Sequence, residues 1–158
     1  MSYLSQVSRA LDDEHRSNLE LLGRAERVFA RAGDPETAPL AGRLVRHLEH
    51  EIGRHFGFEE DRLFPRMADA GDGDLAGMLR EEHDTIRAVA GELLPLARAA
   101  AAGTLAPGDT GTLRRLVLEI VERQVAHIQK ETMALLPLLD TLLDDDADRE
   151  LAFAYASD

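Results

Sequence analysis

Apolar side chains recur along most of the chain at intervals of three and four residues, which is the spacing of one face of an α-helix. Four segments carry such a stripe, and turn-forming sequences at residues 32–35, 70–73 and 103–109 separate them. The stripes run from Leu4 to Val28, from Leu40 to Leu63, from Leu75 to Leu93, and from Leu113 to Leu135. No segment has the pattern of a β-strand, so the sequence predicts four long helices.

Four long helices joined by short loops favour an all-α fold, an antiparallel up-down-up-down four-helix bundle. We expect the bundle to occupy residues 1–143. The remaining residues, 144–158, form an acidic tail or a short extra helix. Residues 144–148 are expected to be solvated, and residues 151–155 either dock as a short extra helix or remain loose. Three prolines within or near the ends of the helical patterns predict kinks or helix ends: Pro65, Pro95 and Pro137.

The composition of the chain limits which partners and which metal ligands are possible. The 158 residues suffice for one domain with a core, and the net charge of −12 argues against binding to nucleic acid or to an anionic membrane surface. The absence of cysteine excludes disulfides, iron–sulfur clusters and Cys-ligated zinc, which leaves His and carboxylate as the strong metal ligands. No apolar run reaches membrane-spanning length and the N-terminus has no signal-like segment, so we expect a cytoplasmic protein.

One motif, His-x-x-x-Glu, occurs twice, as His55–Glu59 and as His127–Glu131. A proline follows each Glu by six residues, and a lone histidine precedes each copy, His15 before the first and His83 before the second. Positions i and i+4 lie on the same face of a helix, so each helical hairpin directs two imidazoles and a carboxylate toward a shared interior. The duplication predicts a site for two metals.

The numbering alone tests whether these residues meet. In an antiparallel hairpin, residues equally far from the loop lie at the same height. His15 and His55 are each twenty residues from a loop centred near residue 35, and Glu59 and His83 are each twelve from residue 71. His83 and His127 are each twenty-two from residue 105. All candidate ligands therefore lie within one helical turn, ~5 Å, of a single level.

The competing interpretation is that these residues are surface pairs on charged helices, because His and Glu at i and i+4 also pair well in water. Convergence at one level favours the metal site. Buried His and Glu without partners would each cost ~2 kcal/mol or more, and a metal removes that cost. Iron suits mixed imidazole and carboxylate ligands. The predicted ligands are His15, His55, Glu59, His83, His127 and Glu131.

Other polar residues near the motifs have two interpretations. His47 and Glu51 continue the i, i+4 ladder and either support the ligands or line an access path, although a solvent-facing position is favoured for His47. His50 points about 140° away from His55 and is expected to face water, as is Glu60. Three aromatic residues are expected in the core: Phe56, Phe58 and Phe64.

With these motifs the sequence resembles the hemerythrin-like, or HHE cation-binding, family of non-heme di-iron four-helix bundles, over roughly residues 5–140. Leu-Phe-Pro and Leu-Leu-Pro after the two motifs also fit that family. Oxygen-carrying hemerythrins have His-x-x-x-His on the third helix and His-x-x-x-x-Asp on the fourth. Here Arg87 lies four residues after His83, and Glu131 takes the place of the Asp. The resemblance is thus to the subgroup with four His and two Glu, which includes bacterial stress-response proteins and a eukaryotic iron sensor.

The resemblance implies that His15 and His55 hold one iron and that His83 and His127 hold the other. Glu59 and Glu131 would bridge the two irons, together with an oxo or hydroxo group. Relative to an oxygen carrier, the missing fifth histidine leaves an additional position for water or substrate.

We therefore expect a di-iron protein that binds or reacts with O2, hydrogen peroxide or nitric oxide, in oxidative or nitrosative stress or in sensing, rather than in oxygen transport. If it is an enzyme, a weak catalase-like, peroxidase-like or NO-reactive activity is expected. The alternative is a non-catalytic iron or oxygen sensor, or an iron-binding protein, whose folding depends on metal. A helical interaction module without metal is the third possibility. We expect a monomer or weak homodimer.

Overall fold

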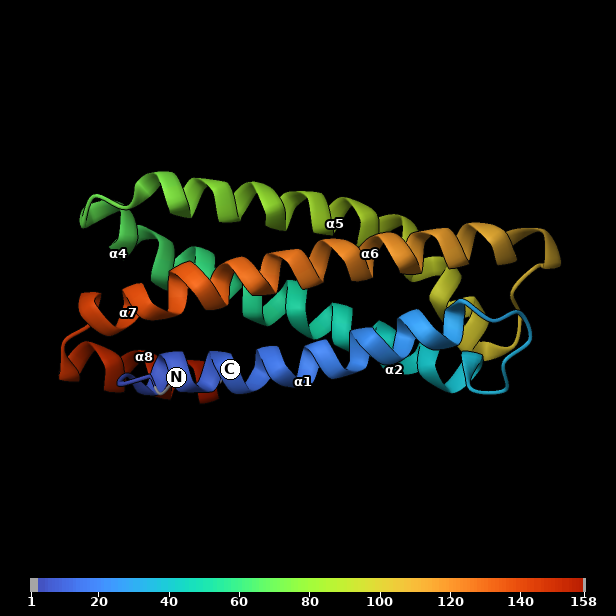
Figure 1. The fold of residues 1–158 in the computed structure, drawn as a ribbon, viewed down its shortest axis with the longest axis horizontal. Helices are drawn as coiled ribbons and strands as arrows, with labels where there is room; N and C mark the ends of the chain where they lie inside the picture. Colours follow the sequence, from blue (N-terminus) through green and yellow to red (C-terminus); the bar gives the residue numbers. More distant parts are fainter. Residues whose placement is uncertain (1–2, 158) are drawn as a thin grey trace.

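The computed structural model describes residues 3–157 and shows four long helical rods lying side by side along one axis, with a shorter helix against one end (Figure 1). Successive rods run in opposite directions, as the connections at alternating ends show. No strand occurs within residues 3–157, so the predicted all-α, up-down-up-down bundle is confirmed. None of the helices in this part of the chain is both long and apolar enough to cross a bilayer.

The first and third rods are the single helices α1 (Gln6–Phe29) and α5 (Gly73–Ala102). The second rod comprises α2 (Thr37–His50), η1 (Glu51–His55), α3 (Phe56–Phe58), η2 (Glu59–Leu63) and α4 (Phe64–Asp69). After the 3₁₀ turn η3 (Pro107–Asp109), the fourth rod comprises α6 (Thr110–Lys130), η4 (Glu131–Leu135) and α7 (Leu136–Leu142). The short helix α8 spans Asp145–Ser157. Pro95 does not end its helix, since α5 continues to Ala102.

Both rods that carry the His-x-x-x-Glu motif contain wide, π-helical turns. In η2 and η4, the amide of the residue just before the proline donates to the carbonyl of the Glu that opens the turn. Pro65 and Pro137 have no amide hydrogen, and their rings crowd the carbonyl four residues back. The extra residue in each turn accommodates the proline without breaking the rod. Proline six residues after Glu is thus the local signal for these π turns, which often occur at functional sites.

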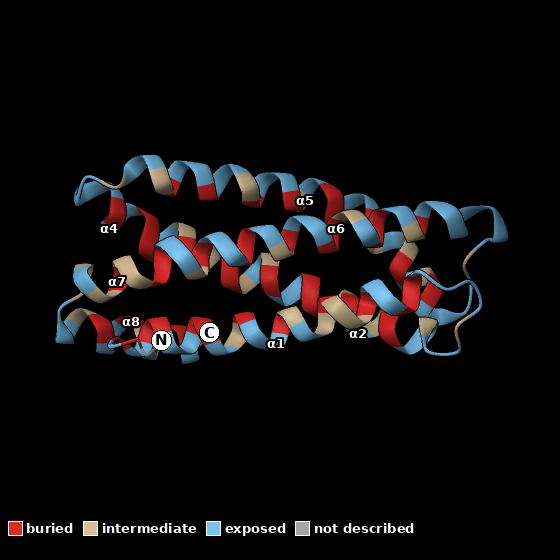
Figure 2. Cartoon of the chain, viewed as in Figure 1, coloured by how far each residue is buried: buried red, intermediate tan, exposed pale blue. Residues whose placement is uncertain are grey.

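The core consists of two apolar clusters. One lies toward the α1–α2 and α5–α6 loops and includes Leu22, Leu44, Leu93 and Val117; the other lies toward α8 and includes Leu11, Leu63, Leu79 and Leu139. The buried faces of all four rods point inward, as Figure 2 shows. Between the clusters each rod contributes buried His or Glu, so a polar layer crosses the middle of the bundle.

The acidic segment differs from the expectation. Asp144, Asp145 and Asp146 are exposed, but Asp148 is buried, and its two carboxylate oxygens accept the amide hydrogens of Gln6 and Val7 at 2.9 and 3.0 Å. The expected solvated position is therefore wrong for Asp148, because its carboxylate caps the first turn of α1. Residues 145–157 form a docked helix rather than a loose end.

Replacing Asp148 with Ala should destabilise the protein by about 1–2 kcal/mol, because two amides in the first turn of α1 lose their acceptor. Urea unfolding followed by circular dichroism measures this change. The matched control, exposed Asp145→Ala, should alter the free energy of unfolding by no more than about 0.5 kcal/mol. Equal effects of the two replacements would contradict the capping role.

Candidate metal centre

All six side chains predicted as ligands are buried in the polar layer. Their ligand atoms form two overlapping groups, each with atoms within 4.8 Å of one another. One group is His15, His55, Glu59 and Glu131, and the other is Glu59, His83, His127 and Glu131. We name the histidine pairs the first position (His15 and His55) and the second position (His83 and His127). The two Glu residues belong to both.

Each shared carboxylate presents one oxygen to each position. Glu59 places Oε2 3.2 Å from His55 Nε2 and Oε1 3.1 Å from His83 Nε2. Glu131 places Oε1 3.0 Å from His15 Nε2, and Oε2 3.3 Å from His127 Nε2. This is the arrangement in which a carboxylate joins two neighbouring cations.

At the second position, the outward-facing ring nitrogens meet carboxylates. His83 Nδ1 lies 2.7 Å from Glu60 Oε2, and His127 Nδ1 lies 2.8 Å from Glu82 Oε1. A carboxylate only accepts, so a neutral imidazole here carries its hydrogen on Nδ1 and turns the lone pair of Nε2 inward. Metal-binding histidines typically have this arrangement.

At the first position the outer partners are weaker. His15 Nδ1 lies 3.3 Å from the hydroxyl of Thr132. His55 Nδ1 lies 3.3 Å from Glu14 Oε1 and 3.2 Å from the hydroxyl of Tyr155. The two positions therefore share Glu59 and Glu131 but differ in the groups that orient their histidines.

Two further observations indicate that the six candidate ligands suit bound cations. Glu59 Oε1 and Glu131 Oε2 are buried and accept no hydrogen bond within the described part of the chain, although each lies beside a histidine Nε2. His83 Nε2 and His127 Nε2 lie 3.1 Å apart, so two inward lone pairs would repel each other without a proton or a cation between them. An unsatisfied buried acceptor costs about 1–3 kcal/mol. Cations among these atoms remove both problems.

The electrostatics of the layer also favour positive charge. Burial alone would lower the pKa of His127, but attraction to the carboxylates of Glu131 and Glu59, together with the hydrogen bond that His127 Nδ1 donates to Glu82, outweighs it and raises that pKa to about 9. Burial would likewise lower the pKa of His55, yet Glu51 and Glu59 raise it well above its ordinary value. Burial would raise the pKa of Glu131, but His127 and the other histidines hold it well below its usual range. Protons and cations therefore compete for the imidazole nitrogens that face these ionised carboxylates.

Aromatic rings fix the second position. The ring of Phe56 stacks on His83 with 3.8 Å between centroids and 5° between planes. The ring of Phe64 also stacks on His83, with 5.5 Å between centroids. The Arg87 guanidinium lies 5.5 Å from the centre of the Phe56 ring and bonds Glu60 at 2.8 Å. Both phenylalanines are buried, in agreement with the core position expected for them. The His83 ring thus contacts Phe56, Phe64 and Glu60, which restrict its orientation.

Two sequence expectations about neighbouring residues are wrong. His47, expected to face water, is buried and lies 3.1 Å from Gln124 Oε1 on the facing rod. Glu60, also expected to face water, has only 9% of its side chain exposed because it reaches His83. His50 is exposed, as expected, and pairs with Glu14 at 2.8 Å.

Glu51, for which two roles were open, is buried. Its carboxylate accepts from Asn18 Nδ2 at 3.1 Å and lies 3.9 Å from His55 Nδ1. It therefore supports the first position from outside rather than lining a path to solvent.

The residues that contact Nδ1 of the four histidines follow the internal repeat, which is a signal that the His-x-x-x-Glu motif alone does not contain. Glu14 and Glu82 each directly precede the lone histidine of their hairpin, and each contacts the motif histidine, His55 or His127. Glu60 and Thr132 each directly follow the motif Glu, and each contacts a lone histidine, His83 or His15. Alignment of the two hairpins thus identifies these sequence neighbours of the candidate ligands as the residues that orient the histidines.

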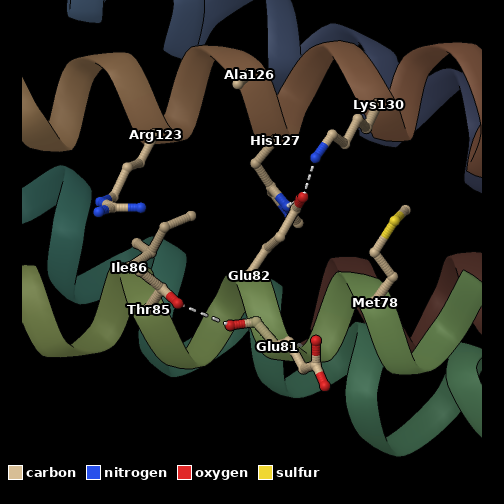
Figure 3. Close-up of a pocket in the computed structure, with 9 residues that line it drawn as sticks. All are labelled: Met78, Glu81, Glu82, Thr85, Ile86, Arg123, Ala126, His127 and Lys130. Atoms are coloured by element: carbon tan, nitrogen blue, oxygen red, sulfur yellow. Dashed lines mark hydrogen bonds and ion pairs between the residues drawn. The ribbon is translucent and has the colours of Figure 1, made fainter.

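A groove of about 350 Å³ lies between α5 and α6 beside the second position (Figure 3). Glu82 links the layer to this groove, since its carboxylate contacts both His127 Nδ1 and the ammonium of Lys130. The other lining residues are Met78, Glu81, Thr85, Ile86, Arg123 and Ala126. A small molecule in the groove is separated from the metal centre by the side chains of Glu82 and His127.

Two comparisons with known proteins bear on the family of this chain. No curated protein matches the sequence significantly. The family model of the hemerythrin HHE cation-binding domain matches residues 6–139, which include the four rods up to α7 and all six candidate ligands, while α8 lies beyond the match. The chain belongs to the hemerythrin HHE cation-binding domain family.

Proposed function

We propose that this protein holds two iron ions and binds or reacts with a small oxidant, O2, hydrogen peroxide or nitric oxide, in oxidative or nitrosative stress or in sensing. The observation that carries the proposal is the pair of adjacent four-atom ligand groups that share Glu59 and Glu131. Family membership supports cation binding. The mixed imidazole and carboxylate donors favour iron.

When bound, two irons supply redox and Lewis-acid chemistry toward a small oxidant. The chain provides two imidazole nitrogens and two carboxylate oxygens to each position. Near His83, the residues at i−4 and i+4 are Leu79 in the core and Arg87 bonded to Glu60, so neither is a further ligand. With so few protein donors, an ion at either position would have room to bind an exogenous molecule. This favours reaction with that molecule over a centre in which the protein occupies every coordination position.

The surrounding residues keep the centre dry and oriented. The two apolar clusters exclude water from both ends of the layer, which strengthens each electrostatic contact inside it. Glu60 and Glu82 hold the hydrogens of His83 and His127 on Nδ1. The groove beside His127 brings a small molecule from solvent to the outer side of the second position, where Glu82 and His127 separate it from the centre.

The decisive test is the metal content per chain, measured by elemental analysis together with the near-ultraviolet and visible absorption of the air-oxidised protein. We expect two irons per chain, followed by a spectral response to peroxide, O2 or nitric oxide in stopped flow. Absence of bound metal even after anaerobic loading with ferrous ion would overturn the proposal and would favour a plain helical interaction module.

His83→Ala should remove the iron of the second position, because His127 alone would remain there with the shared carboxylates. The first position keeps both histidines, so the iron content should fall toward one per chain or the absorption spectrum should collapse. Elemental analysis and absorption measure the result, with exposed His50→Ala as the matched control. Two irons and an unchanged spectrum in His83→Ala would show that the ligand assignment is wrong.

A second candidate function is a non-catalytic sensor or iron-binding protein whose folding depends on metal. The observation that favours it is the polar layer itself, which separates the two apolar clusters. Without cations, this layer places unsatisfied carboxylate oxygens in the middle of the core. Strong stabilisation by iron with negligible peroxide turnover would favour this function over the first.

A further inference from the structure

Tyr155 is an exception to the internal repeat. The carboxylate and hydroxyl partners Glu14, Glu60, Glu82 and Thr132 are all sequence neighbours of the candidate ligands. Tyr155 comes instead from α8, beyond the residues that the family model matches, and it has no counterpart in the other half of the repeat. A helix outside the family match therefore contacts the first position, through His55.

The hydroxyl of Tyr155 completes a three-membered contact with the layer. It lies 3.2 Å from His55 Nδ1 and donates to Glu14 Oε2. The Nδ1 hydrogen of His55 then faces both the Tyr155 oxygen and Glu14 Oε1, which lies 3.3 Å away. This arrangement holds the hydrogen on Nδ1 and directs Nε2 of His55 toward the shared carboxylates.

The ring of Tyr155 is fixed by residues that flank the ligands. Phe58 lies 4.7 Å away between ring centroids, and the Arg54 guanidinium lies 5.0 Å from the ring centre. Arg54 also donates to the main-chain carbonyl of Tyr155. Tyr155 is buried, so its hydroxyl has a defined place rather than a range of exposed rotamers.

We propose that Tyr155 is a positioning residue for His55, through which docking of α8 and cation binding at the first position depend on each other. A cation on Nε2 fixes the His55 tautomer whose Nδ1 hydrogen the Tyr155 oxygen accepts. Coupling of this kind is reciprocal, so a docked α8 raises cation affinity and a bound cation stabilises the docked helix. The inference rests on the proposed cation binding, and it assigns the chain-terminal helix a role in that site.

The test compares two Tyr→Phe variants of the full chain. Tyr155→Phe removes the hydroxyl and keeps the ring against Phe58 and Arg54. Tyr3→Phe is the matched control, because Tyr3 is also buried but its hydroxyl donates to the carbonyl of Thr132 at 3.3 Å. Anaerobic titration with cobalt(II), whose visible absorption reports its ligands, gives the affinity and spectrum for each bound ion. Hydrogen exchange of the α8 amides, with and without cobalt(II), reports docking.

In Tyr155→Phe we expect the affinity for one of the two ions to fall about 10- to 100-fold, with a changed absorption band for that ion. The protection of α8 that cobalt(II) adds in the wild type should be lost. Tyr3→Phe should match the wild type in both measurements. Unchanged affinities, spectrum and α8 protection in Tyr155→Phe would overturn this inference alone. A wild type that binds no cobalt(II) would overturn the proposed function as well.

Discussion

Replacing Glu131 with Gln should abolish the two-metal centre, because one side chain serves both positions. Its Oε1 faces His15 and its Oε2 faces His127, so the amide leaves a nitrogen in place of one of these oxygens. Loss of groups that merely orient a ligand lowers metal affinity by roughly 10- to 100-fold, and loss of a shared ligand should cost at least the upper end of that range. Each position then keeps its two histidines, but Glu59 is the one ionised carboxylate left for both.

The experiment is anaerobic loading with ferrous ion, followed by desalting, elemental analysis and absorption spectroscopy of the oxidised protein. Exposed Glu150→Gln makes the same chemical change away from the layer and should retain both irons. Comparison with His83→Ala sharpens the result, since that variant should keep the first position. Retention of two irons by Glu131→Gln would contradict the bridging role of Glu131 and the shared-carboxylate geometry.

The arrangement of the rods and the height of the six residues could be predicted from the sequence for one physical reason. In an antiparallel bundle with short loops, distance from the loop along the chain is distance along the bundle axis. His55 and His15 meet because they are equally far from their loop, and the structure places them in one group of ligand atoms. Helical periodicity then decides which side chains face inward.

The contacts around the candidate ligands depend on the direction in which each side chain points, and the distance from the loop does not give that direction. Adjacent residues on a helix point about 100° apart, so Glu60 was expected to face water beside inward-facing Glu59. The ring of His83, projecting from α5, instead lies between the two carboxylates, with Nε2 toward Glu59 and Nδ1 toward Glu60. The opening of the wide turn η2 at these residues also departs from ideal α-helical geometry.

The position of α8 could not be predicted because its partners are distant in sequence. The run from Asp144 to Asp148 has the composition of a solvated tail. Asp148 is buried where its carboxylate accepts the first amides of α1, and Tyr155 is buried where its ring meets Phe58 and its hydroxyl lies beside His55. Neither set of contacts is visible until the bundle brings the two ends of the chain together (Figure 1).

Removal of metal should strongly destabilise the bundle. A ligand that binds only the folded state, present at a thousandfold excess over its Kd, stabilises by about 4 kcal/mol. For a chain of this size that corresponds to a Tm increase of roughly 8–16 °C for each ion. The structural cause is the polar layer, where Glu59 Oε1 and Glu131 Oε2 are buried and have no hydrogen-bond partner in residues 3–157.

Calorimetry of the same preparation with ferrous ion and after treatment with a chelator measures this difference. Glu131→Gln should show little dependence of Tm on ferrous ion, because it has lost the shared ligand, whereas Glu150→Gln should behave as the wild type. The Tm shift taken together with the reactivity toward peroxide or nitric oxide separates the two candidate functions. A large shift with rapid peroxide or nitric oxide chemistry identifies a reactive centre that also stabilises its fold. A large shift without such chemistry identifies a sensor whose signal is folding, while equal Tm values with and without iron would contradict both.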